Sequence, residues 1–150
     1  MAITPYVVRR IGAGNNNPDI ENFDVDASQT IATGNFVVVA SGLLQPATSS
    51  TTGEIVGLAN FALENGASAT TTKDYPVVLA KNSVIRMNFT NAGTKKTFTT
   101  ADLYGSAYGL SDANTLNPDD TTGGFLQVVG FDNTKLTVDV VVTAAAQYLV

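Results

Sequence analysis

Residues Thr121–Phe131 read TTGGFLQVVGF, and a similar stretch, TTGEIVGLANF, stands at Thr51–Phe61. In both, a Thr-Thr-Gly turn signal leads into a short apolar run, a pattern typical of a buried β-strand. The chain has 150 residues, which favours a single domain. The repetition of this sequence pattern in so short a chain indicates a fold built from two related halves.

The segments around the two phrases follow in the same order. Each half opens with a Gly before an apolar run, passes through a Pro-containing loop to the Thr-Thr-Gly signal, and continues into a further β segment. These landmarks are Gly34, Gln45–Ala47 and Tyr75–Ala80 in the first half, and Gly105, Asn117–Asp119 and Lys135–Val142 in the second. Gly-flanked Val runs are common in β proteins, so chance similarity is the alternative to an internal duplication.

A duplication has a physical rationale, because one strand-loop-strand unit buries a single apolar face and needs a partner for it. A second copy supplies that partner, and the two together predict a sandwich or a small barrel. Gly57 and Gly130, which follow the valines of the two phrases, are expected to mark β-bulges or sharp bends in their strands.

The rest of the chain also favours strands over helices. Val84–Phe89 and Lys135–Val142 alternate apolar and polar residues with the period of two that a half-exposed strand shows. Pro76 restricts its segment to a sheet edge or a strand start. The expected strands are Asn35–Ala40, Ile55–Leu63, Tyr75–Ala80, Val84–Phe89 and Lys135–Val142.

Helical signals are short. Thr100 is expected to N-cap a single turn that Gly105 ends. Ala144–Ala146 favours either another turn or the approach to a final strand at Tyr148–Val150. The sequence therefore predicts an all-β fold.

The N-terminal segment differs in character from the remainder. A short apolar stretch is followed by a Gly- and Asn-rich segment and then by Asp19, Glu21, Asp24 and Asp26. This composition favours turns and irregular backbone. We expect residues 1–28 to form an extended arm and residues 29–150 to form the domain; an ordinary first strand with a surface loop is the alternative.

Composition narrows the function classes. The chain contains neither Cys nor His, so a thiol nucleophile, a disulfide framework and the commonest general base are all missing. The net charge of −5 with scattered basic residues argues against nucleic acid as a partner. No apolar run is long enough for a membrane helix, and no secretory signal opens the chain. We expect a protein that is not an enzyme and binds neither nucleic acid nor membranes.

Two segments resemble known ligand-binding motifs in part. Asp112–Asp120 gathers oxygen-bearing side chains, but it departs from the EF-hand template, since Asn117 replaces the central Gly and Gly123 the terminal Glu. Gly12–Asn17 begins like a dinucleotide fingerprint but lacks its third Gly. We therefore expect no metal site, no cofactor and no catalytic residues, with a weak calcium site in Asp112–Asp120 as the alternative.

One resemblance to a known family rests on specific residues. Gly34–Val38, followed by a loop and by Gly53–Ala59 with the sequence GEIVGLA, resembles the pattern of tailed-bacteriophage capsid decoration (cement) proteins. The similarity extends over about Thr33–Val142. It implies a β-barrel or β-tulip domain that forms a homotrimer, is made in the host cytoplasm, and binds the major capsid protein on the exterior of the virion to stabilise the lattice.

In several members of that family an N-terminal arm reaches across neighbouring capsid subunits. The corresponding apolar and basic stretch here predicts the capsid-contacting residues Tyr6, Val7, Val8, Arg9 and Arg10. The alternative function is a carbohydrate-binding or adhesive β module of a fibre or surface protein. That function predicts a row of exposed aromatic side chains, for which Tyr6, Tyr104, Tyr108 and Tyr148 are candidates.

Overall fold

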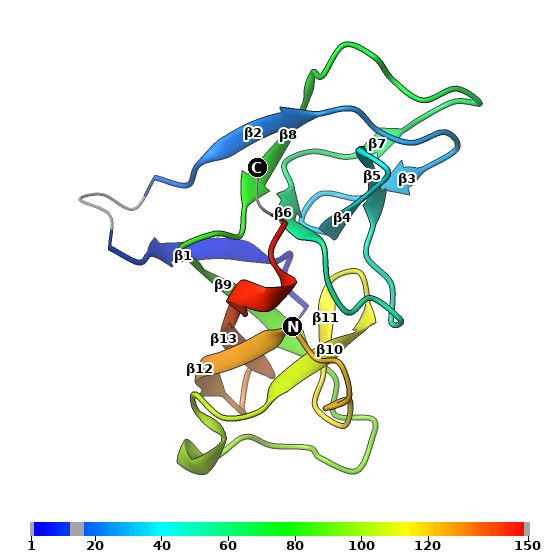
Figure 1. Ribbon diagram of the computed structural model, residues 1–150. Coiled ribbons are helices and arrows are strands. Elements are labelled where there is room, and N and C mark those ends of the chain that lie inside the picture. The colour runs from blue at the N-terminus through cyan, green and yellow to red at the C-terminus, as the bar shows by residue number, and fades with distance from the viewer. Residues whose placement is uncertain (1, 13–16, 149–150) are drawn as a thin grey trace.

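The computed structural model describes residues 2–12 and 17–148. As expected, it is an all-β protein, with only two single-turn 3-10 helices, η1 (Thr100–Asp102) and η2 (Ala144–Ala146), in this part of the chain. The strands divide into two groups, which Figure 1 shows above and below strand β1 (Tyr6–Arg10). The chain completes most of the upper group before it builds the lower one.

The first half forms an antiparallel sheet with the strand order β2-β8-β6-β4-β5. A two-stranded sheet of β3 (Thr30–Ile31) and β7 (Leu63–Glu64) lies beside it. The strands of the main sheet are β2 (Ile20–Phe23), β4 (Phe36–Ala40), β5 (Leu43–Pro46), β6 (Ile55–Ala59) and β8 (Tyr75–Leu79).

The second half is a closed five-stranded β-barrel, because β9 pairs with both β13 and β11 and so joins the two ends of the sheet. Strand β1 adds to the outside of this barrel as a further partner of β9. The barrel strands are β9 (Ser83–Phe89), β10 (Ala107–Asp112), β11 (Thr115–Asn117), β12 (Leu126–Asp132) and β13 (Thr137–Val142).

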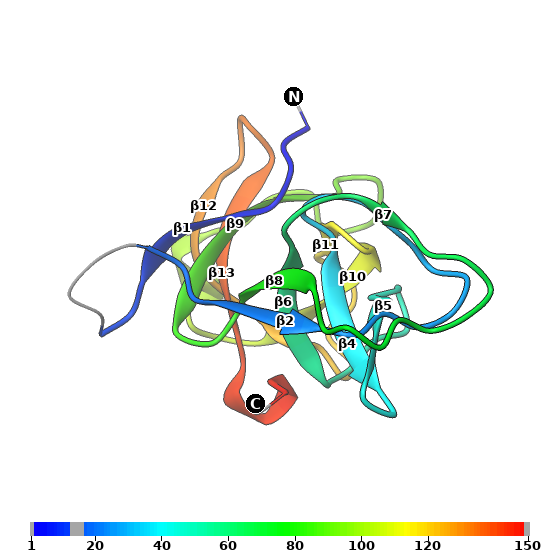
Figure 2. The ribbon, with the colours of Figure 1, turned by 90° about the horizontal axis from the view of Figure 1, so that it is seen from above.

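The two halves have the same topology. The five strands, in chain order, are β2, β4, β5, β6 and β8 in the first half and β9 to β13 in the second. In both halves the second strand pairs with the third and the fourth, the fourth pairs with the fifth, and the fifth pairs with the first. In each, the first strand or its continuation also meets the third in parallel: Phe89 lies opposite Leu116, and Val25 forms an isolated bridge with Leu44. Figure 2 shows the first half from above, where β2, β8, β6 and β4 lie close together.

The registers agree as well as the strand order. A row across three strands joins Val37, Gly57 and Leu79 in the first half, and its counterpart joins Tyr108, Leu126 and Val142 in the second. This agreement across strands supports an internal duplication. It also shows that Gly57 corresponds to Leu126 and not to Gly130, so the two quoted phrases are similar in pattern but offset in register.

Both glycines nevertheless lie at β-bulges, as expected. Val37 pairs with Gly57 and Val38 with Ile55, which leaves Val56 as the extra residue of β6. In β12, Val128 and Gly130 pair with successive residues of β13, which leaves Val129 unpaired. The glycine directly after each extra residue lets the strand return to its register at the bend.

Two apolar clusters fill the structure. The larger one occupies the closed barrel and includes Phe36 and Leu58 from the first half, and the smaller one lies within the first half around Val25 and Leu44. The ring of Phe36 meets that of Phe125 edge-on at 6.4 Å between centroids. The two halves therefore share part of one core.

Several local expectations need correction. The expected strand Ile55–Leu63 is two strands, because the chain turns after Ala59 and begins β7 at Leu63. Of the two alternatives for Pro76, the strand start is confirmed and the sheet edge is not: Pro76 is the second residue of β8, which lies between β2 and β6, and β6 ends opposite its neighbour Val77. The N-cap of η1 is Thr99 and not Thr100.

The N-terminal segment is integrated into the sheets where the structure describes it, whereas the C-terminal end meets them through an isolated bridge of Gln147 with Ile55. Strand β1 pairs with β9 and β2 pairs with β8, so the N-terminal segment is extended but contains an ordinary first strand, the alternative to a separate arm. Near the C-terminus, Ala144–Ala146 is the expected turn and not a strand. Leu149 and Val150 lie outside the described residues, as do positions 13–16 of the Gly- and Asn-rich segment.

Candidate interaction surface

Strand β1 carries the five residues that the sequence nominated, and the fold holds this strand firmly. Pro5 is buried, and together with Thr4 it packs on the backbone of Gly34. A side chain at Gly34 would collide with Thr4, so the glycine is what admits the N-terminal segment at this point. Strand β1 is therefore attached to both halves of the molecule, since it pairs with β9 on one side and contacts the first half through Gly34.

The five nominated side chains are not equally accessible. Tyr6 is 47% exposed and Arg9 is also exposed. Val7 packs against the core of the barrel, and Val8 is the extra residue of a bulge between β1 and β9. Arg10 forms an ion pair with Asp19 at 2.7 Å. Tyr6 and Arg9 are thus the members of the set that a partner can reach most readily.

A row of side chains crosses the outer face of the barrel from Tyr6. Tyr6 lies opposite Arg86 on β9, and Arg86 lies opposite Asp139 on β13. The Arg86 guanidinium donates two hydrogen bonds to the Asp139 carboxylate, at 2.7 and 2.9 Å. This bidentate contact with Asp139 raises the pKa of Arg86 above its usual value, and it fixes the plane of the guanidinium.

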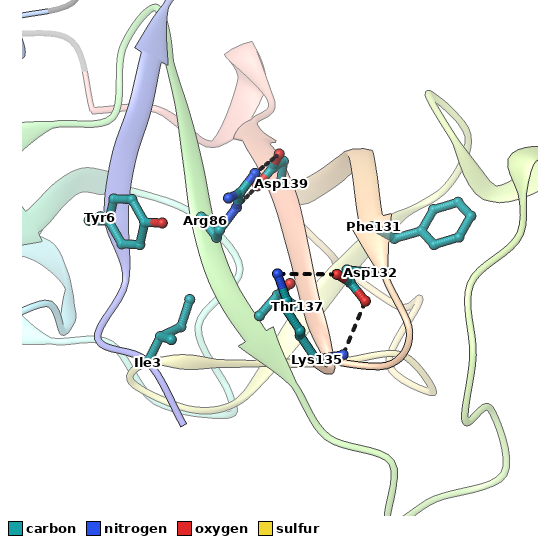
Figure 3. A pocket seen from close by; sticks show the side chains of 8 residues that line it. All are labelled: Ile3, Tyr6, Arg86, Phe131, Asp132, Lys135, Thr137 and Asp139. Atoms are coloured by element: carbon teal, nitrogen blue, oxygen red, sulfur yellow. Dashed lines mark hydrogen bonds and ion pairs between the residues drawn. The ribbon is translucent and has the colours of Figure 1, made fainter. Parts of the chain in front are cut away.

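A hollow of about 370 Å³ lies over this row. Figure 3 shows Tyr6 and Ile3 on one side of it, the Arg86–Asp139 pair in the middle, and Phe131 on the opposite side. Lys135 approaches Asp132 to 3.8 Å at the lower rim. Two positive and two negative side chains line the hollow, so it carries no formal net charge and favours neither anions nor cations.

A second hollow, of about 490 Å³, lies between β1 and the first half. Pro5 and Val7 form one wall, and Leu58, Ala59 and Val78 belong to the other. None of the described side chains that line it is charged. Tyr6 borders both hollows, of which the first is lined by charged side chains and the second by uncharged ones.

Each of the two larger sheets ends on an N-terminal strand. Strand β1 is the last strand of one sheet order and β2 the last strand of the other. Large apolar side chains gather on and beside these two strands, since Tyr6, Ile11 and Ile20 are 47%, 47% and 52% exposed. An open strand edge with exposed apolar side chains is the usual signature of a surface that meets another chain.

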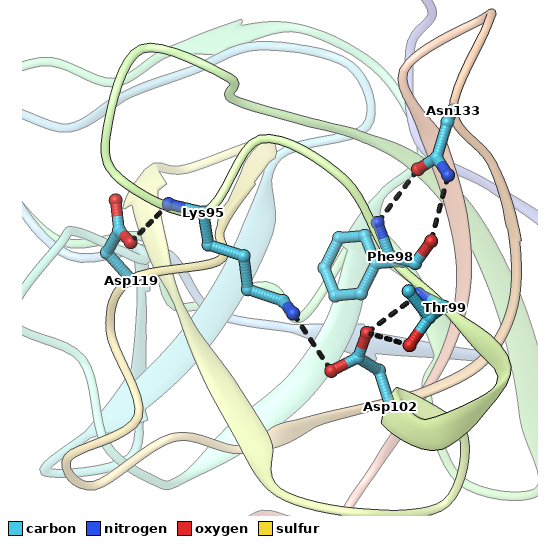
Figure 4. Close-up of polar contacts among 6 residues, drawn as sticks. All are labelled: Lys95, Phe98, Thr99, Asp102, Asp119 and Asn133. Atoms are coloured by element: carbon cyan, nitrogen blue, oxygen red, sulfur yellow. Dashed lines mark hydrogen bonds and ion pairs between the residues drawn. The ribbon is translucent and has the colours of Figure 1, made fainter.

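The segment Asp112–Asp120 uses its carboxylates to shape loops. The Asp119 carboxylate accepts hydrogen bonds from the backbone N–H groups of Thr94 and Lys95, both at 2.8 Å, and Figure 4 shows it beside Lys95. Asp112 accepts a hydrogen bond from the Asn114 backbone at 2.9 Å. Within the described residues, no three acidic side chains come together as they would around a metal ion.

The exposed aromatic row that a carbohydrate-binding module predicts is only partly present. Tyr104 is 67% exposed, but Tyr108 is 4% exposed and packs edge-on against Phe98 in the core. Tyr148 is half-buried. Tyr6 is the candidate among the four that borders a hollow and is also well exposed.

The sequence reasoning missed Arg86, Asp139 and Ile20 as parts of this surface. The sequence contained a signal for Arg86 and Asp139, since both lie on the polar face of strands in which apolar and polar residues clearly alternate. No such signal existed for Ile20, because its exposure depends on which strand β2 pairs with. That information lies in the tertiary structure.

Comparison with known proteins adds no assignment. No family model matches the chain, and no curated protein matches it either. No helix in the described part of the chain has both the length and the apolar character needed to cross a membrane.

Proposed function

We propose that this chain is a virion structural protein that binds the outer surface of a bacteriophage capsid and stabilises its lattice. The partner is the major capsid protein, and the chain acts as a homotrimer on the capsid exterior after synthesis in the host cytoplasm. In this role it performs no chemistry. Its task is to present a rigid surface that contacts several subunits.

The observation that carries this proposal is the position of β1. Strand β1, with exposed side chains at Tyr6 and Arg9, lies on a closed barrel, and Tyr6 borders two hollows. The stretches that resemble decoration proteins, Gly34–Val38 and Gly53–Ala59, contribute to the paired strands β4 and β6, and Gly34 lies against the residues just before β1. A rigid scaffold lowers the entropy lost on binding, which suits a protein that must hold a lattice together.

The direct test is cosedimentation with expanded, undecorated capsids of the phage that encodes the chain. We expect saturable binding of the wild-type protein, and at least roughly tenfold weaker binding for Tyr6→Ala and for Arg9→Glu, because exposed Tyr and Arg residues commonly dominate binding energy. Tyr104→Ala is the matched control, since Tyr104 is exposed but lies outside β1. Failure of the wild-type protein to sediment with capsids would refute the proposal.

The second candidate function, a carbohydrate-binding module, has one observation in its favour. Tyr6 borders a hollow whose middle holds the bidentate Arg86–Asp139 pair, and an aromatic ring beside fixed polar groups suits a neutral sugar. A glycan array separates the two functions. Specific sugar binding that Tyr6→Ala abolishes, together with no capsid binding, would favour this second candidate.

A further inference from the structure

The internal duplication reveals a difference between the outer edges of the two halves. In the second half, Ser83–Arg86 of β9 pair with β1. Because Phe89 and Val25 hold equivalent positions at the closing contacts of the two halves, the residues equivalent to Ser83–Arg86 are Asp19–Asn22 at the start of β2. No strand of the described chain pairs with the outer edge of this stretch.

The burial of the two stretches follows from this difference. Ser83, Val84 and Ile85 are 2%, 1% and 0% exposed. The equivalent stretch of β2 has exposed side chains, and Ile20 is 52% exposed. The first half therefore leaves open a position that its counterpart fills with an extended, antiparallel strand.

The backbone of β2 is ready to accept such a strand. The Asp19 carbonyl accepts a hydrogen bond from the Leu79 N–H at 2.9 Å, so residue 19 points toward β8. Backbone groups alternate in direction along an antiparallel strand. Ile20 and Asn22 consequently direct their N–H and C=O groups outward, away from β8, where a further strand would bind them.

Strand β1 offers a complementary edge. Its inner edge pairs with β9, as the hydrogen bond from the Ile11 N–H to the Asn82 carbonyl at 2.7 Å continues to show just beyond its end. Arg10 is one residue out of phase with Ile11, so its backbone groups point away from β9. Arg9 on β1 is exposed, and so is Glu21 on β2. The two open edges therefore have opposite charges.

We propose that the outer edge of β2 is a strand-docking site, and that β1 of a second copy of this chain occupies it. The contact joins different surfaces of the two copies, so it is heterologous, and three such contacts can close into a ring. Sheets would then run continuously from one copy to the next. This inference rests on the self-association in the proposed function and assigns the surface that produces it; it does not depend on capsid binding.

The first test is the mass of the purified protein by multi-angle light scattering, from about 1 to 100 µM. We expect a trimer for the wild-type protein and for Asn22→Ala, which keeps the outward N–H. Asn22→Pro removes that N–H without removing a bond to β8, and we expect it to be monomeric over this range. Circular dichroism that matches the wild-type spectrum would show that Asn22→Pro is folded.

Either of two results would overturn the inference. If the wild-type protein is a monomer at 100 µM, it does not self-associate and the inference is wrong. Capsid binding is then still decided separately, by cosedimentation. If Asn22→Pro is still a trimer, the protein self-associates, but not through the outer edge of β2.

A crosslinking experiment identifies the partner strand. The chain contains no Cys, so Arg9→Cys and Glu21→Cys variants, mixed and oxidised, can form a mixed disulfide only between copies. Because Arg10 and Ile20 both direct their backbone groups to the open edges, an antiparallel pair between them places Arg9 opposite Glu21, and the two new thiols should face each other. We expect at least about tenfold more mixed disulfide than with Glu21→Cys and Ser50→Cys, whose second site is an exposed loop position. Equal yields would contradict the proposed pairing.

Discussion

Gly57 lies where β6 passes close to the backbone of β8. A Cβ built at this position would collide with the carbonyl oxygen of Val78 and would approach the Ala80 nitrogen to 2.9 Å. Both contacts are with backbone, which cannot rotate away as a side chain can. The glycine is therefore required by the packing of two strands, in addition to its place at the bulge.

Replacement of Gly57 by Ala should lower the free energy of unfolding by about 1–3 kcal/mol, because the strands must separate to admit the methyl group. Gly53→Ala is the control, since no atom lies within 4 Å of a Cβ at Gly53, and we expect it to change stability by less than about 0.5 kcal/mol. Urea unfolding measures both. Equal stabilities of the two variants would show that β6 and β8 are not packed as described.

Tyr75 makes stability depend on pH at the alkaline end. Its side chain is 2% exposed and its hydroxyl donates a hydrogen bond to the Phe61 carbonyl at 2.5 Å. Burial raises the pKa of Tyr75 from 10.0 to about 12. The unfolded chain therefore loses this proton first, so the contribution of Tyr75 to stability is complete below pH 10 and is lost as the pH rises toward 12.

We expect the wild-type protein to lose on the order of 2–3 kcal/mol more than Tyr75→Phe between pH 9 and pH 12, since each unit of pKa shift corresponds to about 1.4 kcal/mol. At pH 8 the variant should be less stable by about 1 kcal/mol, because it lacks the hydrogen bond. Denaturant unfolding at the three pH values tests this. Parallel pH profiles for the two proteins would exclude the buried phenol as the cause.

At the scale of elements, the loop before η1 closes one end of the barrel. Phe98 is 1% exposed and packs edge-on against Phe89, and the Asn133 side chain both donates to and accepts from its backbone. Figure 4 shows Lys95 and Asp102 beside this ring. The Asp102 carboxylate accepts hydrogen bonds from Lys95 Nζ at 2.9 Å and from the Thr99 N–H at 2.7 Å.

The hydrogen bond from Lys95 is the main reason that the pKa of Asp102 lies below its ordinary value of 3.8. The contribution of Asp102 to stability is present above pH 3.8 and is lost as the pH falls through the lowered pKa. Asp102→Asn should be about 1–2 kcal/mol less stable than wild type at pH 7, and the difference should shrink near pH 2. Asp74→Asn, at an exposed position, is the control. A difference that does not change with pH would contradict the role of the charge.

The sequence predicted most strands but not their partners. The alternation of apolar and polar residues in Val84–Phe89 and Lys135–Val142 identified β9 and β13, because a half-exposed strand places apolar residues on its buried face and polar residues on its exposed face. It could not predict that Tyr6 lies opposite Arg86, since that pairing joins residues far apart in the chain. The sequence named the residues of β1 as capsid-contacting residues of an extended arm, whereas their place in a paired strand, the accessibility of Tyr6 and the inward position of Val7 required the fold.

At the scale of the whole molecule, duplication explains the architecture. Two units of the same topology share a core through Phe36 and Phe125, and the second unit closes where β9 meets β11. The all-β class followed from the Gly, Val and Thr patterns, and the repeated phrase indicated two halves. The offset between Gly57 and Gly130 was not accessible from the sequence, because the bulges shift the register only once the strands have paired.

The measurement that tests the account most directly is a cryo-electron microscopy map of expanded capsids with and without the protein. We predict additional density on the outer surface, in rings of three copies, into which the structure fits with Tyr6 and Arg9 of β1 toward the capsid. A capsid surface without added density would contradict the proposed function. Density that fits with β1 facing the solvent would contradict the assigned contact surface.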